Sequence, residues 1–442
     1  MSGTLRALLK AGGAFQSYAY AYPHKTAYRR LAKPRSLAEV WEREDKQSLF
    51  LYAHVPFCEM RCGFCNLFTT THPGGDLVRQ YLDALAVQAE VVAASLGESA
   101  RMARWAIGGG TPTFLSLAEL QRLFEILRSF FRGATDHLPR AIEASPATVD
   151  AAKLEFLREQ GVTRMSLGVQ SLIPAELRTL GRSQPVGELQ RALELLSAVG
   201  FPCLNLDLIY GIPGQTLASW RQSLVGVLEF SPQELYLYPL YVRPLTQLDG
   251  KAWQSPDERL VFYRAGRDYL LAQGYRQISL RLFRRDSYAA PEGPIYCCQE
   301  DGLVGLGAGA RSYTAALHYS TEFAVGRSGI LEVIRDFNQR GRADFAQADY
   351  GFELDLSEQK RRYLLKSLLR AEGLDGPAYA AFFGRSPAAD FPQLQELVDE
   401  QLAEELDGCL RLNARGLEVS DVLGPWLASP VVRAKMARFE LR

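Results

Sequence analysis

The sequence lacks an excess of charge of either sign. Its 442 residues carry 50 basic and 50 acidic side chains, so the formal net charge is zero. It also lacks any uninterrupted apolar run of roughly 18 residues, the length that a membrane-spanning helix needs. The first residues, MSGTLRALLKAGGAFQ, contain no hydrophobic stretch of the signal-peptide kind. These absences predict a cytoplasmic protein that has neither a membrane nor a nucleic acid as its partner.

Internal repeats and low-complexity tracts are absent as well. Apolar residues make up 47% of the chain and charged residues 23%, which is ordinary for a globular enzyme. This composition excludes a disordered tail, a collagen-like fibre and a coiled coil. The length fits one large domain with a smaller one beside it.

Cysteine is scarce, and its number is odd. In a long chain without an export signal, this excludes a disulfide framework. Three of the seven cysteines fall within eight residues, which chance rarely produces. The seven are Cys58, Cys62, Cys65, Cys203, Cys297, Cys298 and Cys409.

Short β-prone runs alternate with helix-period segments over about 220 residues, starting near residue 49. Six such units predict parallel strands joined by right-handed crossovers, with the chemistry at the carboxyl ends of the strands. The predicted strands are 49–55, 103–108, 140–145, 163–169, 203–209 and 234–240. Predicted helices between and after them include 148–160, 185–199, 216–230 and 256–273.

The two ends of the chain differ from this pattern. Charge and proline crowd residues 33–47, which indicates a linker or arm, so 1–47 is predicted as an N-terminal arm. We expect the α/β domain over 48–325 and a small, mostly helical, winged-helix-like accessory domain over 326–442. Its predicted elements are helices at 354–372, 376–383 and 391–406, a strand at 409–413 and a helix near 431–438.

The three close cysteines follow the first predicted strand with the spacing Cys58-x3-Cys62-x2-Cys65. Structural zinc takes four ligands, usually as two close cysteine pairs, and His54 or His72 would have to complete such a site. A [4Fe–4S] cluster normally has four cysteine ligands, so three would leave one iron open to a small molecule. Three buried core thiols fit the polar residues between them poorly.

The motif sequence resembles the radical S-adenosylmethionine (SAM) superfamily, and within it the oxygen-independent coproporphyrinogen III oxidase group. The resemblance rests on HVPFC, AIGGGTPT, RMSLGVQS, NLDLIYGIPGQT and GLGAGARSY in that order, and it covers about residues 48–440. It implies a partial (β/α)6 TIM-like barrel of the radical SAM type with a small, mostly helical C-terminal domain. It also implies a [4Fe–4S] cluster on Cys58, Cys62 and Cys65, with one or two molecules of SAM.

The resemblance further implies which residues contact the cofactor. The glycine loop after the second strand matches the family's site for the SAM amino group, and Glu143 matches an acid that holds SAM. The implied SAM contacts are Tyr52, Phe64, Gly109, Gly110, Thr111 and Glu143. Positions implied near a second SAM are Gln170, Arg182, Asp207 and Gln299, with the loop Gly305–Arg311.

Two departures separate this chain from the named members of that group. Leu67 stands where the oxidases carry a fourth cysteine, two residues after the third. The related heme chaperones carry a His-Asn-x-x-Tyr-Trp element before the late glycine loop, where this chain reads YCCQEDGLVGLGAG. Both departures count against porphyrinogen oxidation and heme handling. We expect the adjacent Cys297 and Cys298 to be buried core thiols.

The predicted function is therefore reductive cleavage of SAM to a 5′-deoxyadenosyl radical that acts on an unidentified small-molecule substrate. A one-electron donor such as flavodoxin or ferredoxin is the implied partner. Arg243 is a candidate contact for an anionic substrate group. The alternatives are a two-SAM methyl or methylene transferase, a coproporphyrinogen oxidase, a heme chaperone without catalysis and a zinc-stabilised structural protein.

Overall fold

The computed structural model describes residues 4–15, 21–131, 138–182, 184–250, 256–289 and 296–441. Its centre is one large sheet with the strand order β1-β15-β14-β13-β12-β2-β5-β6-β7-β8-β9-β11-β10. The six strands from β2 to β9 in that order are mutually parallel, and they include every strand predicted from the apolar runs. They are β2 (Leu49–Val55), β5 (Met102–Gly109), β6 (Arg140–Ala144), β7 (Arg164–Gln170), β8 (Cys203–Tyr210) and β9 (Glu234–Pro239).

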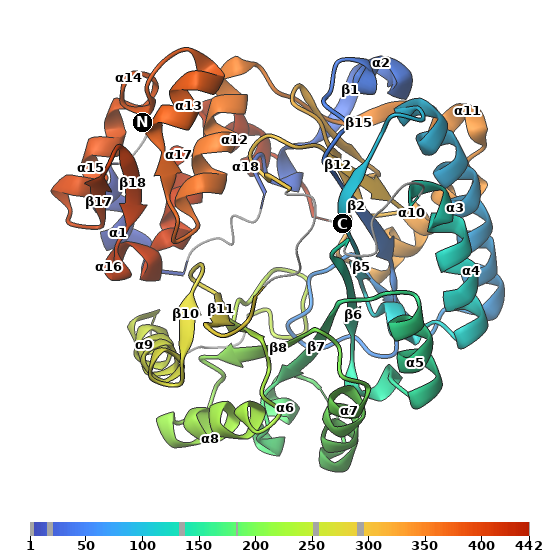
Figure 1. The fold of residues 1–442 in the computed structure, drawn as a ribbon, viewed down its shortest axis with the longest axis horizontal. Helices are drawn as coiled ribbons and strands as arrows, with labels where there is room; N and C mark the ends of the chain where they lie inside the picture. The colour runs from blue at the N-terminus through green and yellow to red at the C-terminus, as the bar shows by residue number, and fades with distance from the viewer. Residues whose placement is uncertain are drawn as a thin grey trace.

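Helices connect these strands and lie on the outer side of the curved sheet (Figure 1). They are α3 (Gly75–Leu96), α4 (Leu117–Leu127), α5 (Ala151–Glu159), α6 (Pro174–Thr179), α7 (Val186–Val199), α8 (Leu217–Leu228) and α9 (Pro256–Ala272). This is the predicted α/β architecture with six strand–helix units. The sheet ends at β1 and β10, and within the described ranges these two edge strands do not pair with each other, so the barrel is partial.

Local sequence explains where these elements begin. Strand β8 is buried along nearly its whole length, as a parallel strand covered on both faces should be. Helix α4 starts with a capping box in which Ser116 accepts from the Glu119 N–H, and the Glu119 carboxylate accepts from the Ser116 N–H. The sequence signals for both elements are therefore local and strong.

The rest of the large sheet comes from both sides of the barrel sequence. Strand β12 (Leu303–Leu306) continues the sheet in parallel beside β2. The antiparallel strands are β1 (Arg29–Ser36), β10 (Tyr275–Gln277), β11 (Leu282–Arg285), β13 (Arg311–Tyr313), β14 (Leu317–Ser320) and β15 (Gln347–Glu353). Helices α2 (Leu37–Glu42), α10 (Arg327–Gln339) and α11 (Arg342–Phe345) contribute buried side chains to the same core.

A second hydrophobic core lies in the C-terminal region, and α1 (Leu5–Gly12) contributes Leu5 to it. In Figure 1 these elements gather on one side of the barrel. The helices are α12 (Leu356–Leu368), α13 (Gly376–Phe383), α14 (Pro387–Asp390), α15 (Gln395–Asp399), α16 (Ala414–Glu418), α17 (Leu423–Leu427) and α18 (Pro430–Ala437). The small sheet has the order β16 (Leu374–Asp375), β18 (Cys409–Leu412), β17 (Ala403–Leu406).

Two local predictions are wrong. Residues 33–47 hold the end of β1 and all of α2 rather than a linker, because β1 pairs with β15 and α2 buries Leu37 and Trp41. The continuous helix predicted over 391–406 stops at α15, and β17 follows it. Asp407 and Gly408 both have positive φ, which closes a tight hairpin between β17 and β18.

The predicted domain division stays a prediction. Residues 327–353, assigned in sequence to the accessory domain, form α10, α11 and β15, and Ile330, Phe337 and Ala348 belong to the first core. Among the described residues, every helix is too short or too polar to span a bilayer.

A buried ion pair joins the C-terminal region to the large sheet. The Arg281 guanidinium donates to both Asp421 oxygens at 2.6 and 2.8 Å, and Tyr241 hydrogen-bonds to the same carboxylate. Arg281 is 6% exposed and Asp421 is 1% exposed. Removing one partner of such a pair leaves the other charge buried and uncompensated.

We predict that Asp421→Ala lowers the free energy of unfolding by about 3–5 kcal/mol in urea denaturation. The control is Asp83→Ala, which removes a carboxylate from an exposed pair with Arg79 and should cost less than about 1 kcal/mol. Equal effects of the two substitutions would contradict the structural role given to Asp421.

Candidate functional site

The three close cysteines lie in one loop at the carboxyl end of β2. Cys58 ends the short strand β3 (Phe57–Cys58), which pairs with β4 (Thr70–Thr71), and Cys62 and Cys65 follow in the loop. All three thiols are free and half-buried. The Cys65 N–H donates to the Cys62 carbonyl at 3.0 Å, so a tight turn separates these two residues. The structure thus brings the predicted metal ligands to the strand end where barrel chemistry occurs.

Main-chain hydrogen bonds fix this loop from several directions. The Gly63 N–H donates to the Leu180 carbonyl at 2.8 Å, and the Leu248 N–H donates to the Gly63 carbonyl at 3.1 Å. The Arg61 side chain donates to the Val325 carbonyl at 2.6 Å. The cysteine loop is therefore attached to segments that follow β7, β9 and β14.

The three sulfur atoms have different neighbours. Cys58 Sγ lies 2.9 Å from the Thr111 hydroxyl, and Arg182 Nη1 donates to Cys62 Sγ at 3.8 Å. Burial raises the pKa of the Cys58 thiol to about 12 and that of Cys65 to about 11, and it raises the Cys62 pKa as well. Without a bound metal, these positions disfavour thiolates. A metal centre that binds thiolates would compensate for this cost.

The donor set fits an iron–sulfur cluster better than a single ion. Zinc needs sulfur ligands about 2.3 Å from one metal atom. Across the described ranges, no three His, Cys, Asp or Glu side chains converge closely enough to hold one ion. A cluster of several irons is larger and accepts thiolates that do not touch one another. Three cysteines, half-buried in one loop, match such a group with one iron left without a protein ligand.

The glycine loop after β5 lies directly against the cysteine loop. The Gly110 N–H donates to the Val55 carbonyl at 2.8 Å, and the Thr111 N–H donates to the Phe57 carbonyl at 2.7 Å. Gly109 has φ +119°, and a Cβ at this residue would lie 2.6 Å from the His54 ring. Only glycine fits here, which brings the backbone close to the space beside the sulfurs.

Glu143 is bound to the glycine loop rather than to a cation. Its Oε2 accepts from the Gly109 N–H at 3.0 Å. The Glu143 side chain is in contact with solvent. It is also surrounded by protein, and this partial desolvation is the largest cause of its raised pKa. This combination describes a side chain on the wall of a solvent-accessible interior. Glu143 can therefore accept further hydrogen bonds close to the cysteine loop, as a contact for an ammonium or for ribose hydroxyls requires.

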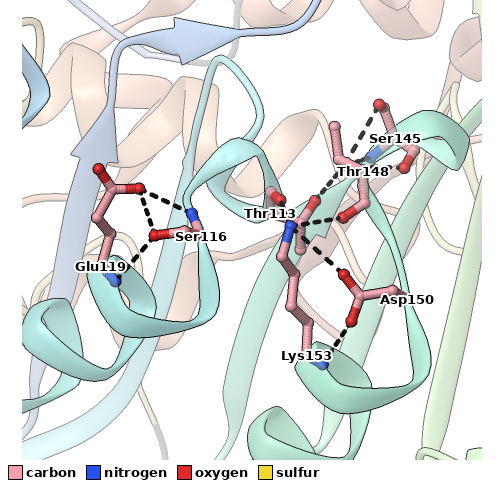
Figure 2. Close-up of polar contacts among 7 residues, drawn as sticks. All are labelled: Thr113, Ser116, Glu119, Ser145, Thr148, Asp150 and Lys153. Atoms are coloured by element: carbon pink, nitrogen blue, oxygen red, sulfur yellow. Dashed lines mark hydrogen bonds and ion pairs between the residues drawn. The ribbon is translucent and has the colours of Figure 1, made fainter. Parts of the chain in front are cut away.

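A polar network joins the segments that follow β5 and β6 (Figure 2). The hydroxyls of Thr113 and Thr148 lie 2.6 Å apart, and Thr148 also donates to the Ser145 carbonyl at 3.0 Å. Lys153 donates to the carbonyls of Thr113 and Thr148 at 2.9 and 3.2 Å, and its Nζ lies 3.7 Å from Asp150 Oδ2. Ser145 hydrogen-bonds to Glu59 of the cysteine loop. Sequence reasoning missed this network, because threonine and lysine spacing carries no signal for it.

Asp207 on β8 faces the same interior. Asn205 donates to it at 2.7 Å and also donates to Ser166 on β7. Burial raises the pKa of Asp207 to about 7, with the Asn205 hydrogen bond acting in the opposite direction. Tyr52 on β2 shares this space, and its pKa is raised by burial and then by Glu143. Acidic groups therefore concentrate on the β6–β8 side of the interior.

Three of the four positions implied for a second SAM lie around Gly168, whose cross-strand neighbour is Asp207. Arg182 is 5% exposed and bonds to Cys62 Sγ and, at 2.8 Å, to the Gly168 carbonyl, so it supports the cysteine loop. Gln170 ends β7 with φ +70°, near Gly168. Gln299 instead lies against α12, where its amide donates to Ser367 at 3.3 Å. Phe64 packs beside a small separate cluster that includes Leu180 and Leu248.

Three further residues have surroundings that the sequence did not indicate. His54 bonds to the Phe68 carbonyl at 2.9 Å and lies 3.3 Å from the Tyr52 hydroxyl, and burial lowers its pKa to about 4. Cys297 and Cys298 are half-buried and point toward Gln299 Oε1, so the expectation of buried core thiols is wrong.

Comparison with known proteins agrees with this geometry. The Radical SAM superfamily model matches residues 52–224. The oxygen-independent coproporphyrinogen III oxidase of Cereibacter sphaeroides is 30% identical over 403 residues, which are 88% of this chain and 86% of that protein. The heme chaperone HemW of Bacillus subtilis is 28% identical over 387 residues, 85% of this chain and 98% of that protein.

The fold agrees with a solved structure of the same kind. The coproporphyrinogen III oxidase HemN of Escherichia coli matches with a TM-score of 0.78 at 24% identity, over 95% of this chain and 98% of that chain. The family match and the 30% identical relative show that the chain belongs to the radical SAM superfamily. Within it, the chain is a member of the group that contains the oxygen-independent coproporphyrinogen III oxidases and the HemW heme chaperones.

We predict that Gly109→Ala lowers the free energy of unfolding by about 1–3 kcal/mol, because the added methyl group meets His54 and the backbone is strained. The control is Gly74→Ala, whose Cβ would meet nothing within 4 Å, and which should change stability by less than about 0.5 kcal/mol. Matching urea midpoints for the two variants would contradict this close approach.

We predict that Asp207 makes a pH-dependent contribution to the free energy of unfolding. Its folded-state pKa lies above the ordinary value of 3.8, so the folded protein binds the proton more tightly than the unfolded chain. This contribution is present below about pH 4 and is lost as the pH rises toward 7, at up to about 1.4 kcal/mol per pH unit. Urea denaturation of wild type without SAM should show this fall relative to Asp207→Asn. Parallel stability curves for the two proteins would contradict it.

Proposed function

We propose that this protein is a radical SAM enzyme that cleaves SAM reductively and directs the resulting radical to a small-molecule substrate. The observation that carries the proposal is the joining of three half-buried thiols to the GGGTP loop by the Gly110 and Thr111 hydrogen bonds. When bound, a [4Fe–4S] cluster with one open iron supplies the electron that splits SAM into methionine and a 5′-deoxyadenosyl radical. The proposal includes the binding of one or two SAM molecules to this protein.

The residues of this chain provide position and charge. Cys58, Cys62 and Cys65 hold the cluster, and Arg182 places a positive charge beside Cys62. The loop of Gly109, Gly110 and Thr111 offers main-chain groups to the amino end of SAM.

Glu143 and Asp207 line the neighbouring wall, together with Tyr52. Their oxygens suit the ammonium and the ribose of SAM, and a sulfonium is stabilised electrostatically by nearby carboxylates. The glycine loop keeps the backbone close enough for these contacts.

The substrate of this chain differs from those of the named relatives in this proposal. Asn66 and Leu67 follow Cys65, and Leu67 is 50% exposed and carries no thiol. The segment before the late glycine loop holds Cys297 and Cys298 in place of the chaperone element. We infer a reaction on another small molecule, with a one-electron donor such as flavodoxin or ferredoxin as partner. Arg243, which lies 4.8 Å over the Tyr241 ring, stays a predicted anion contact.

The test is production of 5′-deoxyadenosine by the anaerobically reconstituted protein with dithionite and SAM. Cys58→Ala, Cys62→Ala and Cys65→Ala should each lower the rate at least 100-fold, because each removes a cluster ligand. Cys409→Ala, at a half-buried thiol of β18 outside the site, should retain the wild-type rate.

Full activity in any one of the three loop variants would overturn the cluster assignment. Formation of S-adenosylhomocysteine in amounts matching a modified acceptor would replace the proposed hydrogen abstraction with methyl or methylene transfer.

A further inference from the structure

Glu176 on α6 is a buried carboxylate that lies outside the cysteine loop. It is 4% exposed, and its two oxygens accept three side-chain hydrogen bonds. Its Oε2 accepts from the Ser171 hydroxyl at 2.6 Å and from the Gln215 amide at 3.0 Å. Its Oε1 accepts from the Ser219 hydroxyl at 2.5 Å. These donors are neutral, and burial of a carboxylate is costly unless its oxygens are hydrogen-bonded in this way.

The three donors come from three segments that are separate in the sequence. Ser171 follows β7, Gln215 belongs to the GIPGQT motif that follows β8, and Ser219 lies in the first turn of α8. Gln215 is itself fixed, because it is 3% exposed and its Oε1 accepts from the Gly211 N–H at 2.8 Å. Glu176 therefore joins the segments after two neighbouring barrel strands to α6.

Helix α6 leads directly to the cysteine loop. The Glu176 carbonyl accepts from the Leu180 N–H at 3.0 Å, and the Leu180 carbonyl accepts from the Gly63 N–H at 2.8 Å. A Cβ on Gly63 would lie 2.9 Å from the Leu180 carbonyl oxygen, so these two segments leave no room for a side chain. Two residues after Leu180, the Arg182 side chain donates to Cys62 Sγ at 3.8 Å.

A small apolar cluster fills the space between the GIPGQT motif and the cysteine loop. Phe64 of the cysteine loop packs against it, and the Leu248 N–H donates to the Gly63 carbonyl at 3.1 Å. The buried members of the cluster are Leu180, Ile209, Ile212, Leu240 and Leu248, each at most 4% exposed. The motif after β8 is thus connected to the cysteine loop through α6 and through this cluster.

We propose that Glu176 is a positioning residue for the iron–sulfur cluster. It holds α6 against the GIPGQT motif, and α6 sets the place of the cysteine loop and of Arg182. The inference rests on the proposed function, because it concerns the cluster that the three cysteines hold. A positive charge beside the Cys62 ligand stabilises the reduced cluster, so the position of Arg182 raises the reduction potential.

The first test is the reduction potential of the reconstituted cluster, measured by redox titration with electron paramagnetic resonance. Glu176→Ala should shift the potential to more negative values, as Arg182→Gln does, because Arg182 loses its place beside Cys62. Adding Glu176→Ala to Arg182→Gln should shift the potential no further. Glu176→Gln should keep the wild-type potential, because the amide has the same size, accepts through its oxygen and donates to the Ser219 hydroxyl.

The second test is hydrogen–deuterium exchange in the full-length protein, read with and without a cluster. Glu176→Ala should speed exchange in the peptide that contains Gly63 at least about tenfold, and should leave exchange in α4 unchanged. The matched control is Glu418→Ala, which removes another buried acid, 5% exposed and 2.6 Å from Arg264. It should leave both the Gly63 peptide and the cluster potential as in wild type.

Far-ultraviolet circular dichroism identifies the variants that fold. If Glu176→Ala does not fold, Gln215→Ala, which removes one donor, replaces it in both tests with the same expected directions. Wild-type potential in Glu176→Ala would overturn the proposal even if exchange is faster, because Glu176 would then be only structural. A further shift in the double variant, or the same shifts in Glu418→Ala, would also overturn it.

The two tests separate this inference from the proposed function. Faster exchange at Gly63 in a protein that never cleaves SAM would contradict the proposed function and leave the attachment of the cysteine loop standing. SAM cleavage by wild type, together with unchanged exchange and potential in Glu176→Ala, would overturn the role of Glu176 and leave the proposed function standing.

Discussion

The site depends on the attachment of the cysteine loop to the strand ends by main-chain hydrogen bonds. Phe57 and Val55 accept from the loop after β5, and Leu180 accepts from Gly63 on the other side. Buried main-chain donors and acceptors are costly to leave unpaired, so these bonds restrict the loop to one position. The thiols, the glycine loop and Glu143 are adjacent because of this attachment and without any direct bond between cysteines.

Part of this arrangement was predictable from the sequence. The six parallel strands come from short apolar runs, and the cysteine and glycine motifs lie at strand ends by topology alone. The hairpin at Asp407 and Gly408 was not predicted, because the helical pattern was extended through residue 406 although an Asp-Gly pair favours a tight turn. Residues 33–47 hold the end of β1, which pairs with β15 more than 300 positions later, and all of α2, which buries Leu37 and Trp41.

Other features depend on tertiary contacts that no local pattern reveals. Arg182 matches a second cofactor position in the resemblance, and only the structure shows that its guanidinium also contacts Cys62 and Gly168. Glu143 matches an acid that holds SAM in the resemblance, and the structure adds the Gly109 main chain as its hydrogen-bond donor.

The central claim is that three thiolates hold an iron–sulfur cluster with one iron free to bind SAM. Electron paramagnetic resonance of the anaerobically reduced protein, recorded with and without SAM, tests it most directly. The account predicts a [4Fe–4S] signal whose g values shift when SAM is added. A signal that SAM leaves unchanged, or protein that binds no iron under reconstitution, would contradict it.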